Sequence, residues 1–405
     1  MRQDVVVTGI GVTAPNGVGA EAFWESTLKG VSGIRPISRF DAAGYPVSVA
    51  GEIPEFEAEK AFTKKLMPQT DRLTRLSLFA SAFALEDAAI RPGELPEFSM
   101  GVSVSSSTGG LEFGQRELQQ LWGTGWESVS AYMSFAWYYA VHTGQISIRN
   151  GMRGPGGVVI SEQAGGLDAL ALARRRVRKG VAVMTAGGMD GLICPYGAAI
   201  QSSAREVSTQ TDPDRAYLPF DPDAAGHVIG EGGAILILES RADAESRQAP
   251  RIHGTIAGYG SAFDPAPAES GGDGLLRAAR VALADAGLTA SDIDVVFADA
   301  AATPSLDRAE ATVLSALFGD CGVPVSAPKT MTGRLLSGGA PLDVAAALLA
   351  IRDRTVPPAV NVVPGRIDPR IDLVTGSGRS LDIRAALILA RGRGGFASAV
   401  VVTRP

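Results

Sequence analysis

The chain has 405 residues and a formal net charge of −6, with 45% of its residues hydrophobic and 20% charged. This length exceeds the size at which one hydrophobic core usually stops growing, so two similar halves are expected. The acidic balance argues against nucleic acid as the main partner. Two cysteines and three histidines, without CxxC or HxxxH spacing, argue against a zinc site or disulfide framework. No apolar run reaches membrane-spanning length, which predicts a cytoplasmic protein without a membrane partner.

The first half alternates predicted strands and helices. The β-branched run after Asp4 indicates a buried strand, and the broad apolar face after Arg72 indicates a long helix. Residues 31–70 are predicted to be irregular and to lie on the surface. Strands are expected at 5–12, 100–104, 158–160, 181–186 and 234–239, and helices at 21–28, 73–89, 111–122, 133–148 and from the corner after 160 to about 179.

A polar segment at 240–251 is the predicted join between an N-terminal half, 1–245, and a C-terminal half, 246–405. Strands are expected next at 252–259, 295–298 and 323–327, helices at 275–286, 308–317 and 342–352, and a closing hairpin at 386–389 and 399–403. This alternation predicts a layered α/β architecture.

A Gly-x-Gly pair follows the first strand of each half, at Gly9 and Gly11 and again at Gly258 and Gly260. The repetition is a weak sign of duplication. A dinucleotide site is disfavoured, because no third glycine opens a helix after Gly11.

The segment from Gly157 to Leu170 predicts a short buried strand, a sharp corner and a helix N-terminus. Backbone N–H groups and the helix dipole favour developing negative charge at such a corner, so enzymes place a serine or cysteine there. This chain has Gln163 at the corner. An amide donates and accepts hydrogen bonds but forms no acyl intermediate, and a glutamine that merely fills a tight turn is equally consistent with this stretch.

Four segments together resemble β-ketoacyl synthases of the thiolase superfamily, and the similarity extends over the whole chain. They are VVTGIGVTAPNG near the start, LPFDPDAAGHVIGEGGAILILE at 218–239, PKTMTGRLLSGGAPLD at 328–343 and ARGRGGFASAVVV at 390–402. The resemblance implies a thiolase-like five-layered αβαβα fold made of two similar halves. It also implies a dimer and a Cys-His-His active site.

Carried over by position, the family's three catalytic residues are replaced here. The cysteine position falls on Gln163, and the two histidine positions fall on Asp299 and Arg334. A carboxylate at neutral pH only accepts hydrogen bonds, and a guanidinium is a permanent cation. The phenylalanine of the C-terminal Gly-Phe-Gly-Gly loop falls on Arg393. Supporting positions survive at Glu310, Lys329 and Gly230-Glu231-Gly232.

The run Glu-Gln-Ala-Gly-Gly-Leu-Asp-Ala resembles one subfamily, the ketosynthase-β subunit, or chain length factor, of bacterial type II polyketide synthases. The resemblance implies a noncatalytic chain in an obligate heterodimer with a cysteine-bearing ketosynthase-α. It implies no cofactor in this chain, because phosphopantetheine arrives on the acyl carrier protein. The expected role is to shape the tunnel that holds the growing polyketide chain.

Two interpretations of Gln163 remain open. It either assists decarboxylation, which would make the chain a malonyl-acyl carrier protein decarboxylase, or plugs a vestigial site. Acidic Asp299 and Glu162 would oppose carboxylate binding, which favours the plug. A nucleophile at Ser161 or Glu162 is disfavoured because neither aligns with the corner. The two cysteines, Cys194 and Cys321, lie outside the corner and are expected to be ordinary small apolar residues.

Leu111, Gly114 and Leu118 stand at i, i+3 and i+7 of a predicted helix. Such a stripe is by itself a core face. In the resembled family the matching helix lies at the subunit interface and closes the polyketide tunnel, which favours a chain-length gate.

Two groups of basic residues are candidates for contacts with acidic partners. The run from Arg174 to Lys179 ends a predicted helix, where cations are expected on dipole grounds. Lys64, Lys65, Arg72 and Arg75 are the better candidates for contact with an acidic acyl carrier protein, and a solvated charged face remains an equal alternative.

Overall fold

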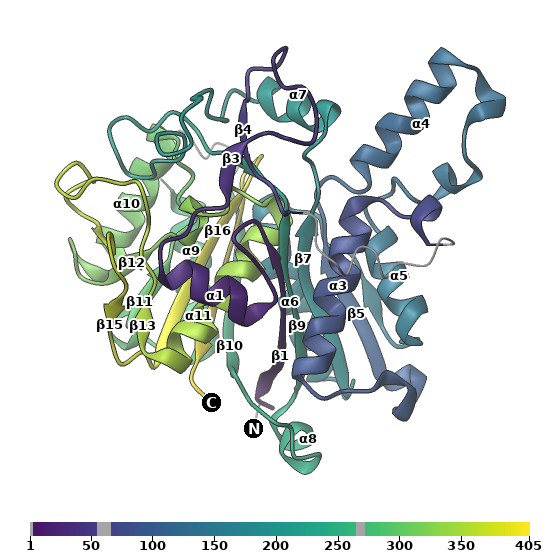
Figure 1. Cartoon of the computed structure of the whole chain (residues 1–405). Coiled ribbons are helices and arrows are strands. Elements are labelled where there is room, and N and C mark those ends of the chain that lie inside the picture. The colour runs from purple at the N-terminus through teal and green to yellow at the C-terminus, as the bar shows by residue number, and fades with distance from the viewer. Residues whose placement is uncertain (1–2, 55–65, 265–271) are drawn as a thin grey trace.

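The computed structural model describes residues 3–54, 66–264 and 272–405, and its strands and helices form stacked layers (Figure 1). The main sheet contains β1 (Val5–Ala14), β2 (Gly17–Val18), β5 (Met100–Ser105), β6 (Gly156–Gly157), β7 (Val183–Asp190), β9 (Gly232–Ser240), β10 (Gly254–Phe263), β11 (Val295–Phe297), β12 (Pro324–Ser326), β14 (Asp372–Leu373), β16 (Ala385–Gly392) and β17 (Phe396–Thr403). Their order is β14-β12-β11-β16-β17-β10-β1-β9-β7-β5-β6, with β2 paired to β1. One small sheet joins β3 (Ile34–Pro36), β4 (Val49–Gly51) and β8 (Ile229–Gly230). Another joins β13 (Thr355–Val356) and β15 (Arg379–Ser380).

The α-helices connect and cover these strands. They are α1 (Ala20–Leu28), α3 (Arg72–Asp87), α4 (Leu111–Gly123), α5 (Val141–Asn150), α6 (Gly165–Val177), α7 (Pro195–Ser203), α8 (Arg241–Ser246), α9 (Asp273–Ala286), α10 (Pro304–Phe318) and α11 (Gly339–Asp353).

The two halves repeat one helix–strand contact. A Cβ placed on Gly11 in β1 would lie 1.8 Å from the carbonyl oxygen of Ala80 in α3, and one on Gly260 in β10 would lie 2.1 Å from that of Ala278 in α9. Only glycine allows so close an approach. Both strands also shift register just before their glycine pair. The Gly-x-Gly repeats therefore mark equivalent contacts of a duplicated fold.

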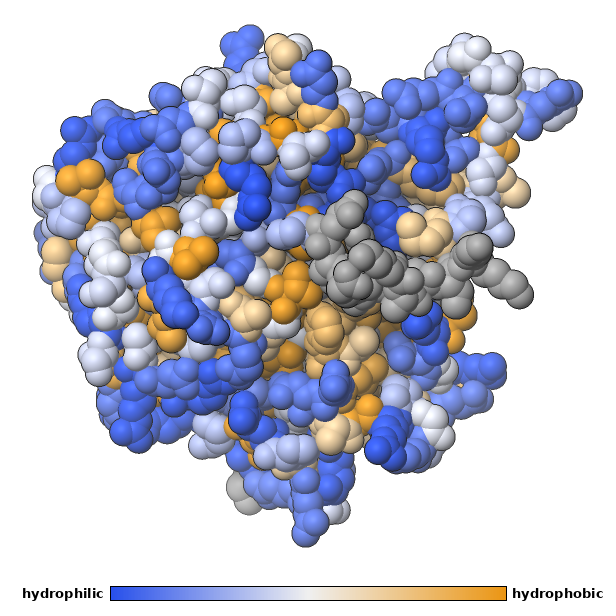
Figure 2. Space-filling model, viewed as in Figure 1, coloured by the Kyte–Doolittle hydropathy of each residue, from blue (hydrophilic) through white to orange (hydrophobic). Residues whose placement is uncertain are grey.

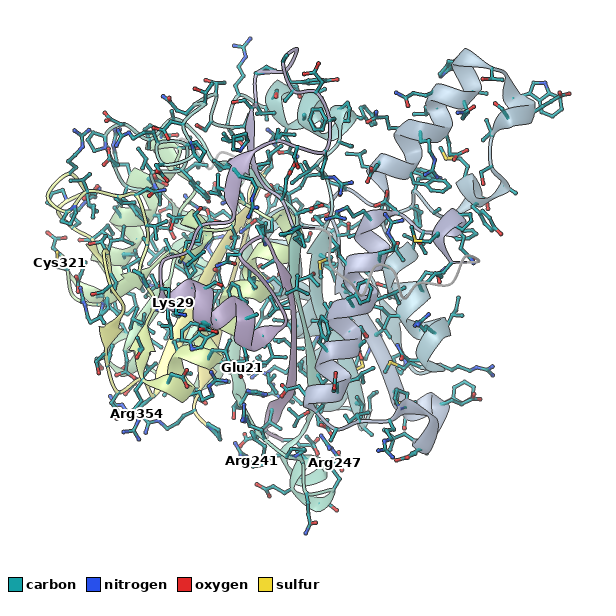
Figure 3. All side chains as sticks on the ribbon, viewed as in Figure 1. Glu21, Lys29, Arg241, Arg247, Cys321 and Arg354 are labelled. Carbon is teal, nitrogen blue, oxygen red and sulfur yellow. The ribbon has the colours of Figure 1, made fainter. Side chains whose placement is uncertain are left out.

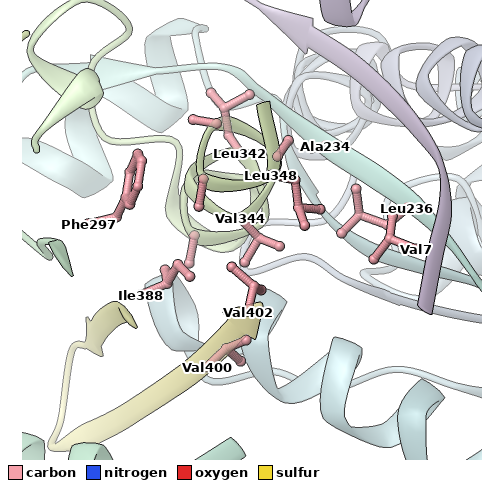
Figure 4. Packing of buried hydrophobic residues seen from close by; sticks show 14 of the residues in the cluster. Val7, Ala234, Leu236, Phe297, Leu342, Val344, Leu348, Ile388, Val400 and Val402 are labelled. Carbon is pink, nitrogen blue, oxygen red and sulfur yellow. The ribbon is translucent and has the colours of Figure 1, made fainter. Parts of the chain in front are cut away.

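The halves enclose two buried central helices. Helix α3 packs on β1 and β9, and α9 packs on β10 and β17, while α6 and α11 lie against β7 and β9 on one side and β17 on the other. Every residue of α11 from Gly339 to Ile351 is buried. Figure 4 shows Val344 and Leu348 of this helix among side chains of surrounding strands. This helix–sheet–helix–sheet–helix order confirms the expected five-layered αβαβα fold.

The strand expected at 158–160 is not formed. Strand β6 pairs with β5 only at Gly156 and Gly157, and the chain then runs without regular structure to Ser161. Ile160 is 43% exposed, and the carbonyl of Val159 accepts a hydrogen bond from the Ser105 hydroxyl instead of a strand partner. The predicted buried strand at 158–160 is therefore wrong. The reason is that β6 lies at the edge of the sheet and has only β5 as a neighbour.

The helix expected at 133–148 begins later, with α5 at Val141. A 3-10 turn, Ala131–Ser134, and an irregular stretch precede it. In this stretch the carbonyl of Trp137 accepts a hydrogen bond from the backbone N–H of Gly110, a bond of 3.0 Å to the corner before α4. A continuous helix would use that carbonyl internally, so the tertiary contact overrides the local pattern.

Helix α4 and the turns after it form an arm that stands away from the body (Figures 1 and 2). We call residues 111–139 the arm. Its exposed apolar side chains include Leu118, Trp122, Trp126, Tyr132, Trp137 and Tyr138. In the described part of the chain, no helix is both long and apolar enough to cross a membrane.

Candidate functional site

The corner that carries Gln163 is a 3-10 turn, η6 (Glu162–Ala164), directly before α6. Gln163 is 1% exposed, and its Oε1 has no hydrogen-bond partner. A Cβ on Gly339, the first residue of α11, would lie 2.5 Å from the Nε2 of Gln163. The glutamine side chain therefore fills the space between the starts of the two central helices.

A second corner faces the first. Turn η9 (Leu336–Gly338) precedes α11 as η6 precedes α6, and Glu162 and Leu336 both adopt left-handed backbone conformations, with φ of 52° and 47°. The Ser337 hydroxyl donates a hydrogen bond of 3.0 Å to the Glu162 carbonyl. The duplication thus brings two helix N-termini together, one of which is the N-terminus predicted after the corner at Gln163.

Asp299 and Arg334, which the sequence resemblance aligned with the family's two histidines, belong to a network of buried ions. The Arg334 Nη2 lies 3.1 Å from the Asp299 Oδ1, and the Arg391 Nε lies 3.1 Å from the Asp299 Oδ2. Arg391 also reaches Glu310, with 3.1 Å between Nη2 and Oε2. The Arg334 Nη2 donates a further bond of 2.7 Å to the Arg391 carbonyl. Asp299 and Arg334 are therefore partners in one structural network.

The network fixes the charges of its members. Burial alone would raise the pKa of Asp299, but the guanidinium groups of Arg334 and Arg391 outweigh it and lower that pKa. Burial alone would lower the pKa of Arg334, but the carboxylates of Asp299 and Glu162 raise it. Asp299 stays an acceptor and Arg334 a cation, so neither can act as the neutral donor that a histidine provides.

Sequence reasoning missed Arg391. It lies in the quoted ARGRGG segment, but the family pattern drew attention to Arg393 two residues later. The available signal was an arginine inside a strand of otherwise apolar residues, because such a charge needs a buried partner. Arg391 is 8% exposed, whereas Arg393 is half-exposed and lies 3.5 Å from Glu206.

The surviving supporting positions are also buried in ion pairs. Lys329 lies 2.8 Å from Asp343 and donates to the carbonyl of Ala298, next to Asp299. Glu231 receives two bonds from Arg72, of 2.7 Å and 2.8 Å. These pairs hold the strand ends and corners around the network.

The pair with Glu231 corrects the set of carrier-protein contacts. Arg72 is 4% exposed and faces the interior, so it is not available to an acyl carrier protein. Arg75 is partly buried and donates to the Thr70 carbonyl. Lys64 and Lys65 lie outside the described residues.

A cavity of about 140 Å³ opens beside the network. It is lined by Glu162, Arg334, Arg391 and Arg393, and by His227, whose Nε2 has no partner. Burial lowers the pKa of His227 to about 3, so the ring is neutral. Gln163 is not among the described residues that line the cavity. A molecule in this cavity would meet Glu162 and Arg334 rather than the glutamine.

The remaining nucleophile candidates are structurally occupied. Cys194 caps α7, and burial raises the pKa of its thiol to about 11, which makes it inert at neutral pH. Cys321 is exposed at the edge of the molecule, and its thiol donates to the Pro369 carbonyl over 3.2 Å (Figure 3). The Ser161 hydroxyl donates to the Asp168 carboxylate, which also accepts hydrogen bonds from the Tyr259 and Ser398 hydroxyls. In the basic run that ends α6, Arg174 is buried and pairs with Asp285 of the second half.

The predicted gate residues lie on α4 in the arm. Leu111 contacts the base of α7, Gly114 is buried, and Leu118 is 39% exposed. A Cβ placed on Gly114 would meet the Cβ of Trp137 at 3.5 Å. The three residues thus extend from the body of the protein to its surface.

Comparison with known proteins places this geometry in a family. The family model of the β-ketoacyl synthase N-terminal domain matches residues 2–244, and that of its C-terminal domain matches 253–363. The ketoacyl synthase β subunit of the tetracenomycin polyketide synthase from Streptomyces glaucescens is 53% identical over 401 residues, covering 99% of this chain and 98% of that protein. Actinorhodin polyketide β-ketoacyl synthase 2 of Streptomyces coelicolor is 51% identical over 400 residues, with the same coverage.

Two solved structures share the fold of this chain over its whole length. The ishigamide ketosynthase/chain length factor has a TM-score of 0.92 and 27% identity, covering the whole of both chains. A ketosynthase solved in complex with its type II polyketide synthase acyl-carrier protein has a TM-score of 0.88 and 25% identity, again over both whole chains.

The fold and the two matching family models define a β-ketoacyl synthase scaffold, with Gln163 at the corner before α6. The chain belongs to the β-ketoacyl synthase family. Within the family, its full-length resemblance is to the ketosynthase-β subunits of type II polyketide synthases, as the sequence motifs predicted.

Proposed function

We propose that this chain is a noncatalytic chain length factor. In this proposal it pairs with a cysteine-bearing ketosynthase-α in an obligate heterodimer and shapes the tunnel that limits the polyketide chain. The acyl carrier protein delivers malonyl units on its phosphopantetheine, and this chain holds no cofactor of its own. The observation that carries the proposal is the buried Arg334–Asp299–Arg391 network around a glutamine corner.

Condensation chemistry conflicts with this network. A ketosynthase needs a thiolate to hold the acyl chain and neutral donors to stabilise the developing negative charge on the thioester. Gln163 provides no thiolate, and both guanidinium groups are committed to Asp299. Replacing either histidine function would require breaking a buried ion pair, which supports a noncatalytic role.

The decarboxylase alternative is less well supported. Repulsion of a malonyl carboxylate by Asp299 is not the argument against it, because Arg334 and Arg391 compensate the charge of Asp299. The reason is access, since Gln163 is buried and does not line the described cavity. A thioester held there could not use the amide as its donor.

The chain-length role is supported by the position of Leu111, Gly114 and Leu118. They lead along α4 toward the exposed apolar surface of the arm. Exposed apolar patches of this kind mark partner surfaces. A tunnel that ends on this helix would be closed jointly by this chain and the ketosynthase.

The decisive experiment reconstitutes the heterodimer with malonyl-acyl carrier protein and compares two variants. Gln163→Ala in this chain should leave condensation and CO₂ release within about twofold of the wild type. Replacing the nucleophilic cysteine of the ketosynthase-α by alanine should abolish condensation. Intact mass of this chain should show no acyl adduct. A stable adduct on Gln163, Ser161 or Glu162, or loss of CO₂ release in Gln163→Ala, would overturn the noncatalytic role.

A further inference from the structure

The space beside Gly114 has a specific neighbour. A Cβ built on Gly114 has one heavy atom within 4 Å outside its own helix and chain neighbours, the Cβ of Trp137. The separation of 3.5 Å is ordinary van der Waals contact. The absent side chain at Gly114 and the bulky one at Trp137 therefore stand against each other across the base of the arm.

The backbone of Trp137 is held by a hydrogen bond within this chain. Its carbonyl accepts the bond of 3.0 Å from the Gly110 N–H, just before α4 begins. A Cβ on Gly110 would lie 2.1 Å from the carbonyl oxygen of Ala136, which is fully buried, so no other residue fits this contact. The segment that carries the tryptophan is thus attached to the first turn of the gate helix.

The indole itself is only partly covered. Trp137 is 46% exposed, and its ring lies 6.0 Å from that of Tyr138 in an edge-to-face arrangement. A rigid side chain with two rotatable bonds forms a well-defined wall, and its N–H can donate to a carbonyl of a polyketide chain. A flexible side chain would give a less sharply defined limit.

We propose that Trp137 is a further specificity-determining residue, whose indole sets the depth of the tunnel together with the missing side chain of Gly114. This inference rests on the proposed function as a chain length factor. It assigns the limit on polyketide chain length to Gly114 and Trp137, which lie in two different segments. The residues of α4 alone therefore do not determine product length.

The test measures product mass from the heterodimer reconstituted with malonyl-acyl carrier protein. Trp137→Ala should shift the main product to a longer chain by one or more two-carbon units, and Trp137→Phe should shift it less. Phe98→Ala is the control, because it removes an aromatic ring that is 68% exposed and lies outside the arm. It should leave the chain length unchanged. If Trp137→Ala fails to assemble with the ketosynthase, Trp137→Leu serves in its place.

Two outcomes separate this inference from the function beneath it. If Gly114→Phe shortens the product while Trp137→Ala leaves it unchanged in an assembled heterodimer, only the role of Trp137 is refuted. If neither variant changes the chain length, the proposed gate itself is refuted. The double variant Gly114→Phe with Trp137→Ala should recover part of the lost length, because the new ring can occupy the vacated space.

Discussion

At the scale of single residues, the site is held together by buried charges that compensate one another. Arg391 contacts both Asp299 and Glu310, while Arg334 contacts Asp299 and the carbonyl of Arg391. Burying such ions is costly unless each is paired and hydrogen-bonded. Asp299, Arg334 and Arg391 therefore contribute to the integrity of the fold.

Removing Arg391 should be strongly destabilising. Arg391→Ala leaves Glu310 buried without its arginine and Asp299 with Arg334 alone, which should cost about 3–5 kcal/mol of unfolding free energy. Arg384→Ala is the control, since its ion pair with Asp294 has a 63% exposed arginine and should matter little. Denaturant unfolding of the heterodimer measures both, and equal effects would contradict a structural role for the network.

Stability should fall on acidification because of His227. Burial lowers its folded pKa to about 3, with Arg334 and Arg393 lowering it further and Asp299 opposing them. The unfolded chain takes up this proton near pH 6.5, so the contribution is present above that pH and is lost as pH falls toward 3. Between pH 6.5 and 5 the loss should be about 2 kcal/mol.

The variant His227→Gln should flatten this part of the stability profile, measured as thermal unfolding against pH. Some slope should remain, because burial also lowers the pKa of His142, to about 4, with the same sign. An unchanged profile would show that His227 is already protonated or solvated in the folded protein.

At the scale of elements, the arm is the part of the fold that local patterns describe least well. Helix α4 was predicted nearly as it is, from its apolar stripe. The predicted helix at 133–148 begins only at Val141, and the Trp137 carbonyl before it accepts a hydrogen bond from the corner before α4. The arm therefore depends on contacts between its two ends, and a change at its base should affect the tunnel more than a change at its tip.

Gly114→Phe should shorten the polyketide by whole two-carbon units. The new ring must enter space bounded by Trp137, where overpacking costs roughly 1–3 kcal/mol, and a large heterodimer should tolerate that loss. Gly123→Phe is the control, because Gly123 ends the same helix with open space around its Cβ position. Product mass decides the matter, and an unchanged mass in an active Gly114→Phe heterodimer would remove the gate from α4.

At the scale of the whole molecule, the arm exposes a concentration of aromatic side chains. Trp122 and Trp126 are 83% and 76% exposed, which is costly for a protein that stays a monomer. Obligate subunit interfaces often exceed ~2,000 Å² and are apolar. The exposed arm is thus consistent with a permanent partner.

Expressed alone, the chain should aggregate or form poorly behaved homodimers. Coexpression with a ketosynthase-α should give a monodisperse heterodimer in light scattering after size exclusion. Trp122→Ser with Trp126→Ser should improve the behaviour of the isolated chain and weaken the heterodimer. A well-behaved isolated monomer with no affinity for a ketosynthase would refute the obligate pairing.

The sequence alone predicted the family, the layered α/β fold and its two similar halves. These follow from local patterns, since buried strands, glycine contacts and motif positions are each encoded within a few residues. Tertiary structure alone decided the rest. It showed that Arg72 is an internal partner of Glu231, that Arg391 completes the buried network, and that Trp137 faces Gly114. Each of these contacts joins residues more than 20 positions apart. The sequence pattern of one segment does not tell which distant charge will pair with its own charge, or which distant ring will pack against it.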